Sequence, residues 1–353
     1  MKHLAPQVKA PERRLSSWPV ETLMHMNEAG MNRVLLKAAL LAFVALLACA
    51  VPAAAQNYPE KPIRLIVAFP TGVSQILGLL LSDKLREPLG QPVVADFRGG
   101  AGGNLAAELA AKAPPDGHTL LLTSNSIAIS PSLYKKLPYD TTRDFAPIAL
   151  IATVPNVMVV HPSVPARSLQ ELARLARSQP GKLNYGSGGV GSSNQLGCEL
   201  FKSIAKVNIV HVPYKGASLA LTAMLGGEVD IVMSTISATI PHIEAGRMRG
   251  LAVLSPERVP TLPKIPTSAE AGMPELVVIT WYGLFAPAGT KQDVITRVNA
   301  DVNKVLRSPD AASQLTKVGV DPKTMTPAEF GKFVREEIDR WARVIKAADI
   351  RAD

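Results

Sequence analysis

The sequence predicts an α/β protein with two domains, each built on a mostly parallel sheet flanked by helices. Three observations support this prediction. The chain has 353 residues, which is long enough for two separate cores. From residue 57 onward, short runs rich in β-branched residues alternate with helical patterns, as in parallel strands joined by helices. Two longer extended stretches, 148–162 and 276–289, interrupt this alternation.

The segment before residue 57 has the pattern of an export signal. Arg33 and Lys37 are followed by an apolar stretch, 38–51, and by small residues that end at Ala55. The apolar stretch is shorter than the roughly 20 residues that a membrane-spanning helix needs. We therefore expect export to the periplasm of a Gram-negative bacterium, with cleavage near Ala55.

Two further interpretations of residues 1–55 stay open. Residues 1–30 lack apolar periodicity and precede a second good start at Met31. The sequence Leu-Leu-Ala-Cys loosely matches a lipoprotein cleavage box, which would leave Cys49 lipidated, although the alanine-rich site further on is the better match. In every case residues 1–55 form an N-terminal extension and signal that are separate from the domains.

Each later element follows from its local pattern. The first series has strands at 63–69, 92–97 and 118–124, with helices at 76–90 and 104–113 between them. The second series has strands at 183–187, 208–214, 229–234 and 249–255, again separated by helices. A last helix starts at a capping box made by Thr326 and Glu329, and its apolar face consists of Phe330, Val334, Ile338, Trp341 and Ile345.

The two extended stretches are the expected crossings between domains. The first domain then contains residues 57–155 and 275–353, and the second contains residues 156–274. The C-terminal segment completes the first domain, so the second domain is an insertion within it.

A glycine-rich loop, LNYGSGGVGSSN, follows a strand and opens a helix. Gly186, Gly188 and Gly191 match the dinucleotide fingerprint G-x-G-x-x-G, and Ser192 with Gln195 forms a capping box. We expect the N–H groups of Gly191 and the three residues after it to point out of the helix, where the helix dipole favours an anion.

Three features argue against a dinucleotide in this loop. The strand that should end in a ribose-binding acid ends in Tyr214 and Lys215. The loop lies in the middle of the chain, and export removes the protein from the cytosolic nicotinamide pool. The loop therefore predicts a site for another small anion, with Lys215 either an anion contact or a member of an ion pair.

Two other loops leave strands in the same way. The first, FPTGVSQIL, supplies Phe69, Gly72, Ser74 and Gln75, and the second, TSNSIAIS, supplies Ser124 and Ser126. Ligands of open α/β sheets bind beyond the carboxyl ends of the strands. We therefore expect the three loops to meet in one cleft.

Composition and motifs argue against several other functions. The formal net charge is +9, but Lys and Arg are scattered and no basic run is interleaved with aromatic residues, so nucleic-acid binding is not predicted. The chain has neither a G-x-S-x-G elbow nor an H-E-x-x-H motif, and no catalytic, cofactor or metal residue is predicted. We expect structural roles for His118, His161, His211, His242 and Cys198, whereas Trp281 either walls the cleft or packs at a crossing.

Many segments together resemble one family, the Bug (TctC-type) extracytoplasmic solute receptors of tripartite tricarboxylate transporters. The resemblance runs from Tyr58 to Ala347 and rests on YPEKPIRLIVAFP, GGAGGN, PPDGHTLLL, SLYKKLPYD, GKLNYGSGGVGSSNQLGCELFK, IVHVPYKG, GGEVDIV, HIEAGRMRGLAV and WYGLFAPAGT. It implies a type II-like periplasmic binding protein whose two domains close about a hinge on a small carboxylate. It also implies a monomer without a cofactor, whose partners are the membrane permease subunits.

The resemblance implies a set of ligand-binding residues on the three loops and at one further strand end. These are Phe69, Gly72, Ser74, Gln75, Ser124, Ser126, Gly188, Ser192, Ser193 and Ser234. The family's first loop is close to F-P-x-G-G-x-x-D, whereas this loop is one residue shorter and places Gln75 at the Asp. Because the lost acid would pair with a ligand ammonium group, we predict a carboxylate without an amino group.

The predicted function is capture of this carboxylate and its delivery to the permease. Two alternatives stay open. One is a sensory receptor of the same fold that docks on the ectodomain of a sensor kinase. The more distant one is an exported hydrolase.

Overall fold

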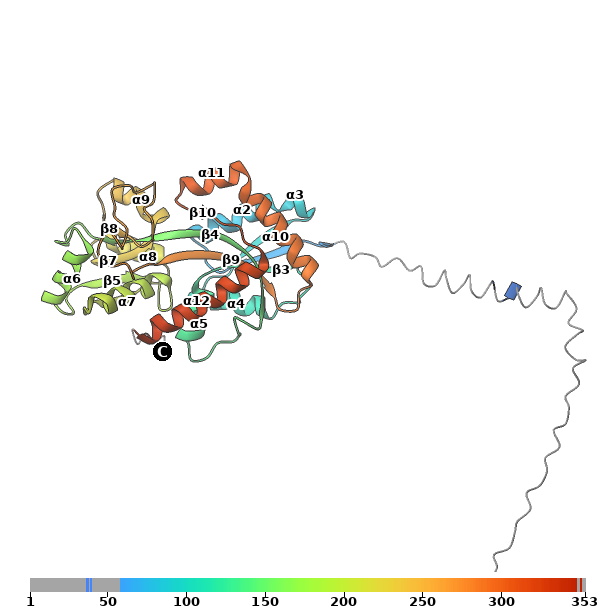
Figure 1. Ribbon diagram of the computed structural model, residues 1–353, viewed down its shortest axis with the longest axis horizontal. Coiled ribbons are helices and arrows are strands. Elements are labelled where there is room, and N and C mark those ends of the chain that lie inside the picture. The colour runs from blue at the N-terminus through green and yellow to red at the C-terminus, as the bar shows by residue number, and fades with distance from the viewer. Residues whose placement is uncertain (1–35, 38, 40–57, 348–349, 351–353) are drawn as a thin grey trace, which may run out of the picture. The chain divides into compact units, whose positions relative to one another are not determined.

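The computed structural model describes residues 58–347 together with Leu36, Lys37, Ala39 and Ile350 (Figure 1). The predicted export signal lies almost wholly outside the described residues. Residues from Tyr58 onward form one unit, so the division of this part into two domains stays a prediction. Among the described residues, none of the helices has the length and apolar character needed to cross a membrane.

The strands form one continuous sheet in the order β2-β1-β3-β9-β4-β7-β5-β6, and β8 and β10 also pair with β4. Their bounds are β1 Ile63–Val67, β2 Val93–Phe97, β3 Thr119–Ser124, β4 Phe145–Val160, β5 Asn184–Ser187, β6 Val210–Pro213, β7 Ile231–Thr235, β8 Arg249–Val253, β9 Ile279–Pro287 and β10 Asp321–Pro322. The strands expected from the sequence are all present, most of them shorter by one or two residues.

Most helices follow strands, as the sequence predicts. Their bounds are α2 Val73–Lys84, α3 Arg86–Leu89, α4 Asn104–Ala111, α5 Ser126–Leu133, α6 Leu169–Ser178, α7 Ser193–Ala205, α8 Ala217–Leu225, α9 Ile236–Glu244, α10 Gln292–Arg307, α11 Pro309–Lys317 and α12 Pro327–Ala347, with a short 3-10 turn at Ala101–Gly103. One expected helix, 76–90, is instead two helices, because Leu85 separates α2 from α3.

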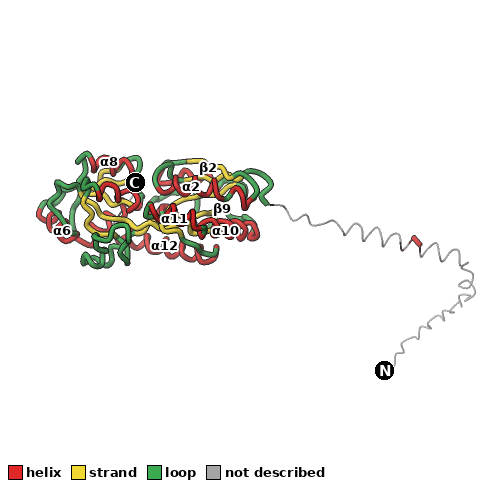
Figure 2. Tube along the Cα trace, turned by 90° about the horizontal axis from the view of Figure 1, so that it is seen from above, coloured by secondary structure: helices red, strands yellow, loops and turns green. Residues whose placement is uncertain are grey.

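The sheet is parallel in two places and antiparallel between them. In one half β1 pairs in parallel with β2 and β3, and in the other half β5 pairs in parallel with β6 and β7. The long strands β4 and β9 pair with each other and with β3 and β7 in antiparallel fashion. These are the two extended stretches of the sequence, and they lie between the two parallel parts of the sheet. Figure 2 shows the strands in yellow among the red helices.

The alternation of side chains along each strand places a core on both faces of the sheet. On β1, Leu65 and Val67 pack in the cluster that includes α2 and α10, whereas Ile66 packs in the cluster that includes α4 and Phe330 of α12. In the other half, Tyr185 of β5 packs with α6 and α7, and α8 packs with Val232 of β7. Helices therefore cover both faces, and the strand ends between them are held in place.

Helix α12 joins the two halves on one side of the sheet (Figure 1). It begins at the predicted capping box, in which the Glu329 carboxylate accepts the Thr326 N–H at 2.8 Å. Its early residues, among them Phe330, pack with β3 and β9, and its late residue Trp341 packs with Cys198 and Phe201 of α7. The predicted apolar face is confirmed, with Ile338 only partly buried.

Candidate functional site

A cavity of about 140 Å³ lies where the carboxyl ends of several strands face the starts of the helices that follow them. It is lined by Phe69, Gly72, Val73, Ser74, Ser124, Ser126, Gly188, Ser192, Ser193, Asn194, Gly216, Ala217, Ser218, Leu221, Ser234, Thr235, Ala238, Thr280 and Tyr282. Nine of the ten residues expected at the site are in this set. The three loops therefore meet at one cavity.

The starts of three helices contribute their first two residues to the cavity lining. These pairs are Val73 and Ser74 of α2, Ser193 and Asn194 of α7, and Ala217 and Ser218 of α8. The first N–H groups of a helix have no intrahelical acceptor and carry the positive end of its dipole. Three adjacent pairs of backbone donors therefore surround one small space, which is the arrangement that binds an anion.

The glycine loop reaches this position through glycine-specific backbone. Gly189 and Gly191 have positive φ values of 111° and 81°, which L-residues rarely adopt. A Cβ atom on Gly188 would lie 2.9 Å from the Ala217 nitrogen, closer than real contacts allow. Glycine at 188 therefore lets the start of α8 approach the end of β5.

Two of the N–H groups expected to face the ligand are used within the loop instead. The Gly191 N–H donates to the Gln195 side chain at 2.8 Å, and the Ser192 N–H donates to the Gly189 carbonyl at 3.2 Å. Ser192 caps α7 as predicted, accepting the Gln195 N–H at 3.4 Å. The N–H groups of Ser193 and its neighbour on α7 lack an acceptor within the described part of the chain, so the donor pair starts two residues later than expected.

Gln75 is the one expected residue that does not line the cavity, and its side chain is exposed. Gly72 caps α2 with φ 69°, and the helix begins at Val73. Ser74 is buried on the cavity side. Because successive helix residues are about 100° apart, Gln75 then faces away. Gln75 therefore does not contribute to the lining of this cavity, although the sequence placed it among the ligand-binding residues.

Several lining residues were not expected from the sequence. Tyr282 and Thr280 come from β9, and Gly216, Ala217 and Ser218 come from the start of α8. Thr280 and Tyr282 share one face of an antiparallel strand whose apolar run predicts only burial. Helix α8 begins after the end of β6 with the sequence Gly-Ala-Ser. This run of small residues is the sequence signal that could have identified this part of the lining.

Tyr282 and Thr280 add hydroxyl donors to the cavity wall. Burial raises the pKa of the Tyr282 phenol well above its usual range, so the phenol keeps its proton at neutral pH. The Thr280 hydroxyl accepts from the Asn156 side chain at 3.0 Å, and its own hydrogen is left for another acceptor. Both groups can therefore donate to an anion.

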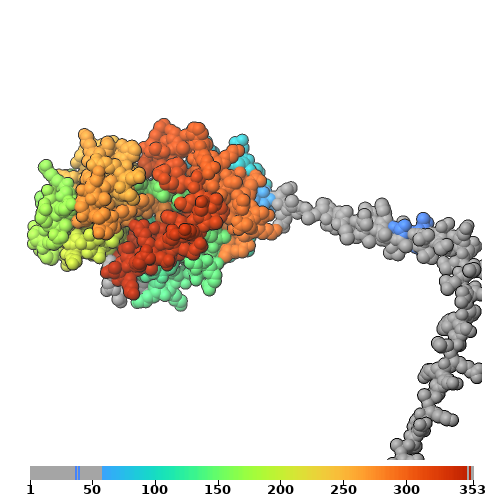
Figure 3. All heavy atoms as spheres, viewed as in Figure 1, coloured from blue at the N-terminus to red at the C-terminus, as the bar shows by residue number. Residues whose placement is uncertain are grey.

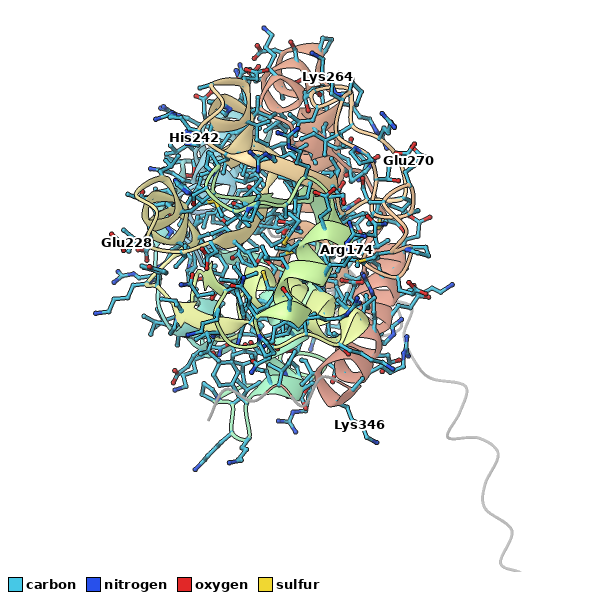
Figure 4. The ribbon with its side chains drawn as sticks, turned by 90° about the vertical axis from the view of Figure 1, so that its left-hand side faces the viewer. Arg174, Glu228, His242, Lys264, Glu270 and Lys346 are labelled. Atoms are coloured by element: carbon cyan, nitrogen blue, oxygen red, sulfur yellow. The ribbon has the colours of Figure 1, made fainter. Side chains whose placement is uncertain are left out.

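No charged side chain is among the described residues that line the cavity. The charged residues of this half lie outside it: Arg174, Glu228, Lys264 and Glu270 are exposed on its outer surface (Figure 4). The polar side chains of the lining are thus all neutral: hydroxyls and the amide of Asn194. An anion held in this way avoids the desolvation cost of a buried arginine or lysine.

The remaining candidates of the sequence lie elsewhere. Trp281 is buried and donates its indole N–H to Glu337 at 2.9 Å, so it packs at the crossing and does not wall the cavity. Lys215 is exposed and lies outside the lining. Burial raises the pKa of the Cys198 thiol to about 12, which favours a structural role over a reactive thiol. The described residues include no group of three or more His, Cys, Asp and Glu suited to a metal ion.

A second cavity, of about 510 Å³, lies beside β4, between the loop 255–261 and the segment 316–323. The surface view shows β4 in green between these two orange and red segments (Figure 3). Its lining mixes apolar residues with charges of both signs, including Arg258 and Asp321. None of the expected ligand residues lies there, and no helix-start pair of donors converges on it.

Comparison with known proteins identifies the family. Residues 79–350 match the family described as "Tripartite tricarboxylate transporter family receptor". A protein of Pseudomonas sp. (strain P51), "UPF0065 protein in tcbD-tcbE intergenic region", is 39% identical over 290 residues, which are 82% of this chain and 86% of that protein. BugT of Bordetella pertussis is 36% identical over 319 residues, 90% of this chain and 98% of BugT.

Solved structures give the same result. "R. palustris Rpa4515 with adipate" superposes with a TM-score of 0.78 at 37% identity and covers 83% of this chain and 99% of its own. "MatC (Rpa3494) from Rhodopseudomonas palustris with bound malate" has a TM-score of 0.76 at 33% identity. The match covers 82% of this chain and 100% of the MatC chain. This chain therefore belongs to the TctC (Bug) family of tripartite tricarboxylate transporter receptors and has the α/β fold of its periplasmic binding proteins.

Proposed function

We propose that this chain is a periplasmic receptor that captures a small carboxylate as a monomer and delivers it to the permease subunits of a tripartite tricarboxylate transporter. The observation that carries the proposal is the cavity lined by three helix starts and by no charged side chain among the described residues. The relatives solved with adipate and with malate support the ligand class. The relatives are receptors, which supports a binding function without catalysis.

The donors suit a carboxylate better than a cation or a neutral solute. The N–H groups at the starts of α2, α7 and α8 form charge-assisted hydrogen bonds with an anion, and these are stronger than bonds to a neutral acceptor. A ligand ammonium group would find no carboxylate among the described lining residues. The predicted preference for carboxylates without an amino group is therefore based on the whole lining of the cavity and not on Gln75.

The proposed mechanism is closure of two domains, residues 57–155 with 275–353 and residues 156–274, about the crossing strands β4 and β9. The cavity takes Ser74 and Ser126 from the first of these parts and Ser193 and Ser218 from the second. A ligand that bonds to both parts has more contacts in the closed form. Its differential affinity then shifts the population toward that form.

Binding to the purified protein, produced by expression of the full chain, tests this proposal. We expect adipate or malate to raise the melting temperature, because a ligand at 100 times its dissociation constant adds about 2.7 kcal/mol of stability. Aspartate and glutamate are the matched amino-bearing controls, and we expect no shift with them. A shift with the amino acids alone would contradict the predicted ligand class, and no shift with any carboxylate would contradict the proposed function.

Tyr282→Phe is expected to weaken carboxylate binding roughly tenfold to a hundredfold, because a hydrogen bond to a charged group contributes about 1.5–3 kcal/mol. Titration calorimetry with the carboxylate found in the screen measures this loss. Tyr139→Phe is the matched control: Tyr139 is a buried tyrosine outside the cavity, and its hydroxyl donates to Asn104 at 2.6 Å. Equal losses in the two variants would mean that the Tyr282 hydroxyl does not contact the ligand.

A further inference from the structure

A serine and a histidine are hydrogen-bonded directly behind the glycine loop. Ser187 is the last residue of β5, is fully buried and does not line the cavity. Its Oγ lies 2.6 Å from Nε2 of His211, on the neighbouring strand β6. Because Ser187 is closed off from the cavity, this pair is not placed to attack a ligand. It is placed to act on the loop that begins at Gly188.

The Ser187 hydroxyl has one hydrogen and two possible acceptors for it. Its oxygen accepts the Gly189 N–H at 3.1 Å, and the hydrogen can go either to His211 Nε2 or to the Gly189 carbonyl at 3.2 Å. When His211 is neutral with its proton on Nδ1, Nε2 accepts from Ser187. When His211 is protonated, Nε2–H donates to the Ser187 oxygen, and the hydroxyl hydrogen must turn toward Gly189.

The Gly189 carbonyl is also the acceptor for a residue that lines the cavity. It receives the Ser192 hydroxyl at 2.7 Å and the Ser192 N–H at 3.2 Å. A carbonyl oxygen has two lone pairs, so a third donor competes with these two. If Ser187 turns toward Gly189, the Ser192 hydroxyl is displaced and becomes free to donate into the cavity.

The charges around His211 come from α7. The imidazole stacks on the Tyr185 ring at 4.7 Å, the Tyr185 hydroxyl donates to Glu199 at 2.6 Å, and Lys202 pairs with Glu199 at 2.7 Å. Burial lowers the pKa of His211, Glu199 opposes this shift and Lys202 adds to it. The imidazole is only half-buried, and Nδ1 has no acceptor or donor in the described chain. Its proton can therefore exchange with solvent.

We propose that His211 is a positioning residue that couples carboxylate affinity to pH: its protonation turns Ser187 toward Gly189 and releases the Ser192 hydroxyl to the ligand. This inference rests on the proposed carboxylate site. By linkage, a bound anion raises the pKa of His211 as much as protonation tightens binding. Affinity is then highest below the ligand-free pKa of His211 and falls as the pH rises through its ligand-bound pKa.

The test measures adipate binding by calorimetry between pH 5 and pH 8 for the purified full-chain product. A rise of one unit in the pKa of His211 corresponds to about tenfold tighter binding at the acidic end. The ligand's own ionisation is removed by taking the ratio of each variant to the unchanged protein in the same buffers. We expect His211→Gln to lose the pH-dependent tightening, while His161→Gln, which changes a partly exposed histidine bonded to Ser163, keeps it.

Ser187→Ala distinguishes the proposed relay, in which the Ser187 hydroxyl turns toward Gly189, from a direct effect of the His211 charge on the ligand. This variant keeps the His211 charge and removes the hydroxyl that turns, so we expect it to lose the pH dependence as well. Melting temperatures of all variants check that they are folded. In addition, NMR titration of the His211 ring is expected to show a higher pKa with adipate than without it.

Four results would overturn the inference. A pH profile of His211→Gln equal to that of the unchanged protein would remove the role of His211. A pH dependence that survives in Ser187→Ala would remove the relay and leave only a charge effect. Adipate binding that does not change with pH would remove the coupling while keeping the proposed function, whereas failure of every carboxylate tested, malate included, to bind at any pH would remove both.

Discussion

Replacing Ser193 with aspartate is expected to abolish carboxylate binding, raising the dissociation constant on the order of a thousandfold. Ser193 is the first residue of α7 and lines the cavity, where the described lining has no cation to neutralise a second negative charge. Two like charges about 4 Å apart repel by about 4 kcal/mol at an effective dielectric constant of 20. The new carboxylate also occupies the helix N-terminus that the ligand would use.

The matched control is Ser193→Asn, which has the same shape without the charge. Asp and Asn are both well tolerated near helix N-termini, so both variants should fold. Titration calorimetry with adipate or malate compares them. Adipate binding that is equally weak in the two variants would indicate a steric effect, and full binding in Ser193→Asp would place the ligand away from the start of α7.

Glu337→Ala is expected to lower the free energy of unfolding by about 3 kcal/mol, within the range for breaking a buried charged network. The Glu337 side chain is buried and accepts the indole N–H groups of Trp281 at 2.9 Å and of Trp341 at 3.1 Å. It also pairs with Arg340 at 3.0 Å. Removal of the carboxylate leaves two buried indole donors without an acceptor, each at a cost of about 1–3 kcal/mol.

Urea denaturation measures this loss, and Glu336→Ala is the control on the same helix. Glu336 is exposed and lies 3.8 Å from Lys332, so its removal should change stability by less than about 0.5 kcal/mol. Similar losses in the two variants would mean that α12 is held to β9 by apolar packing alone. We expect ligand affinity to be retained in both variants where they are folded.

The sequence was enough to predict the strand–helix alternation, the two long strands β4 and β9 and the meeting of three loops. Each of these depends on local signals: β-branched runs, capping residues and glycines at strand ends. The capping box at Thr326 and Glu329 is an example, because all its atoms come from residues within one turn. The antiparallel pairing of β4 with β9 was not predicted, because it joins segments that are far apart in the chain.

The site residues that the sequence did not predict depend on the direction in which side chains point and on contacts between segments that are distant in the chain. Gln75 and Ser74 are adjacent in sequence, yet only the start of α2 decides which of them faces the cavity. Tyr282 lies in an apolar strand, and nothing in that strand separates a tyrosine that packs from one that lines a cavity. The use of the Gly191 N–H by Gln195 depends on a loop conformation set by positive φ values.

The position of β9 between β3 and β4 has a consequence for how the chain reaches its native state. β1, β2 and β3 are synthesised first, but β9 follows only after the whole second half has been made. Pairing between such distant segments is slow, so the nascent chain keeps two unpaired strand edges until its last third is available. A chain truncated before β9 would therefore be an aggregating fragment and not a smaller receptor.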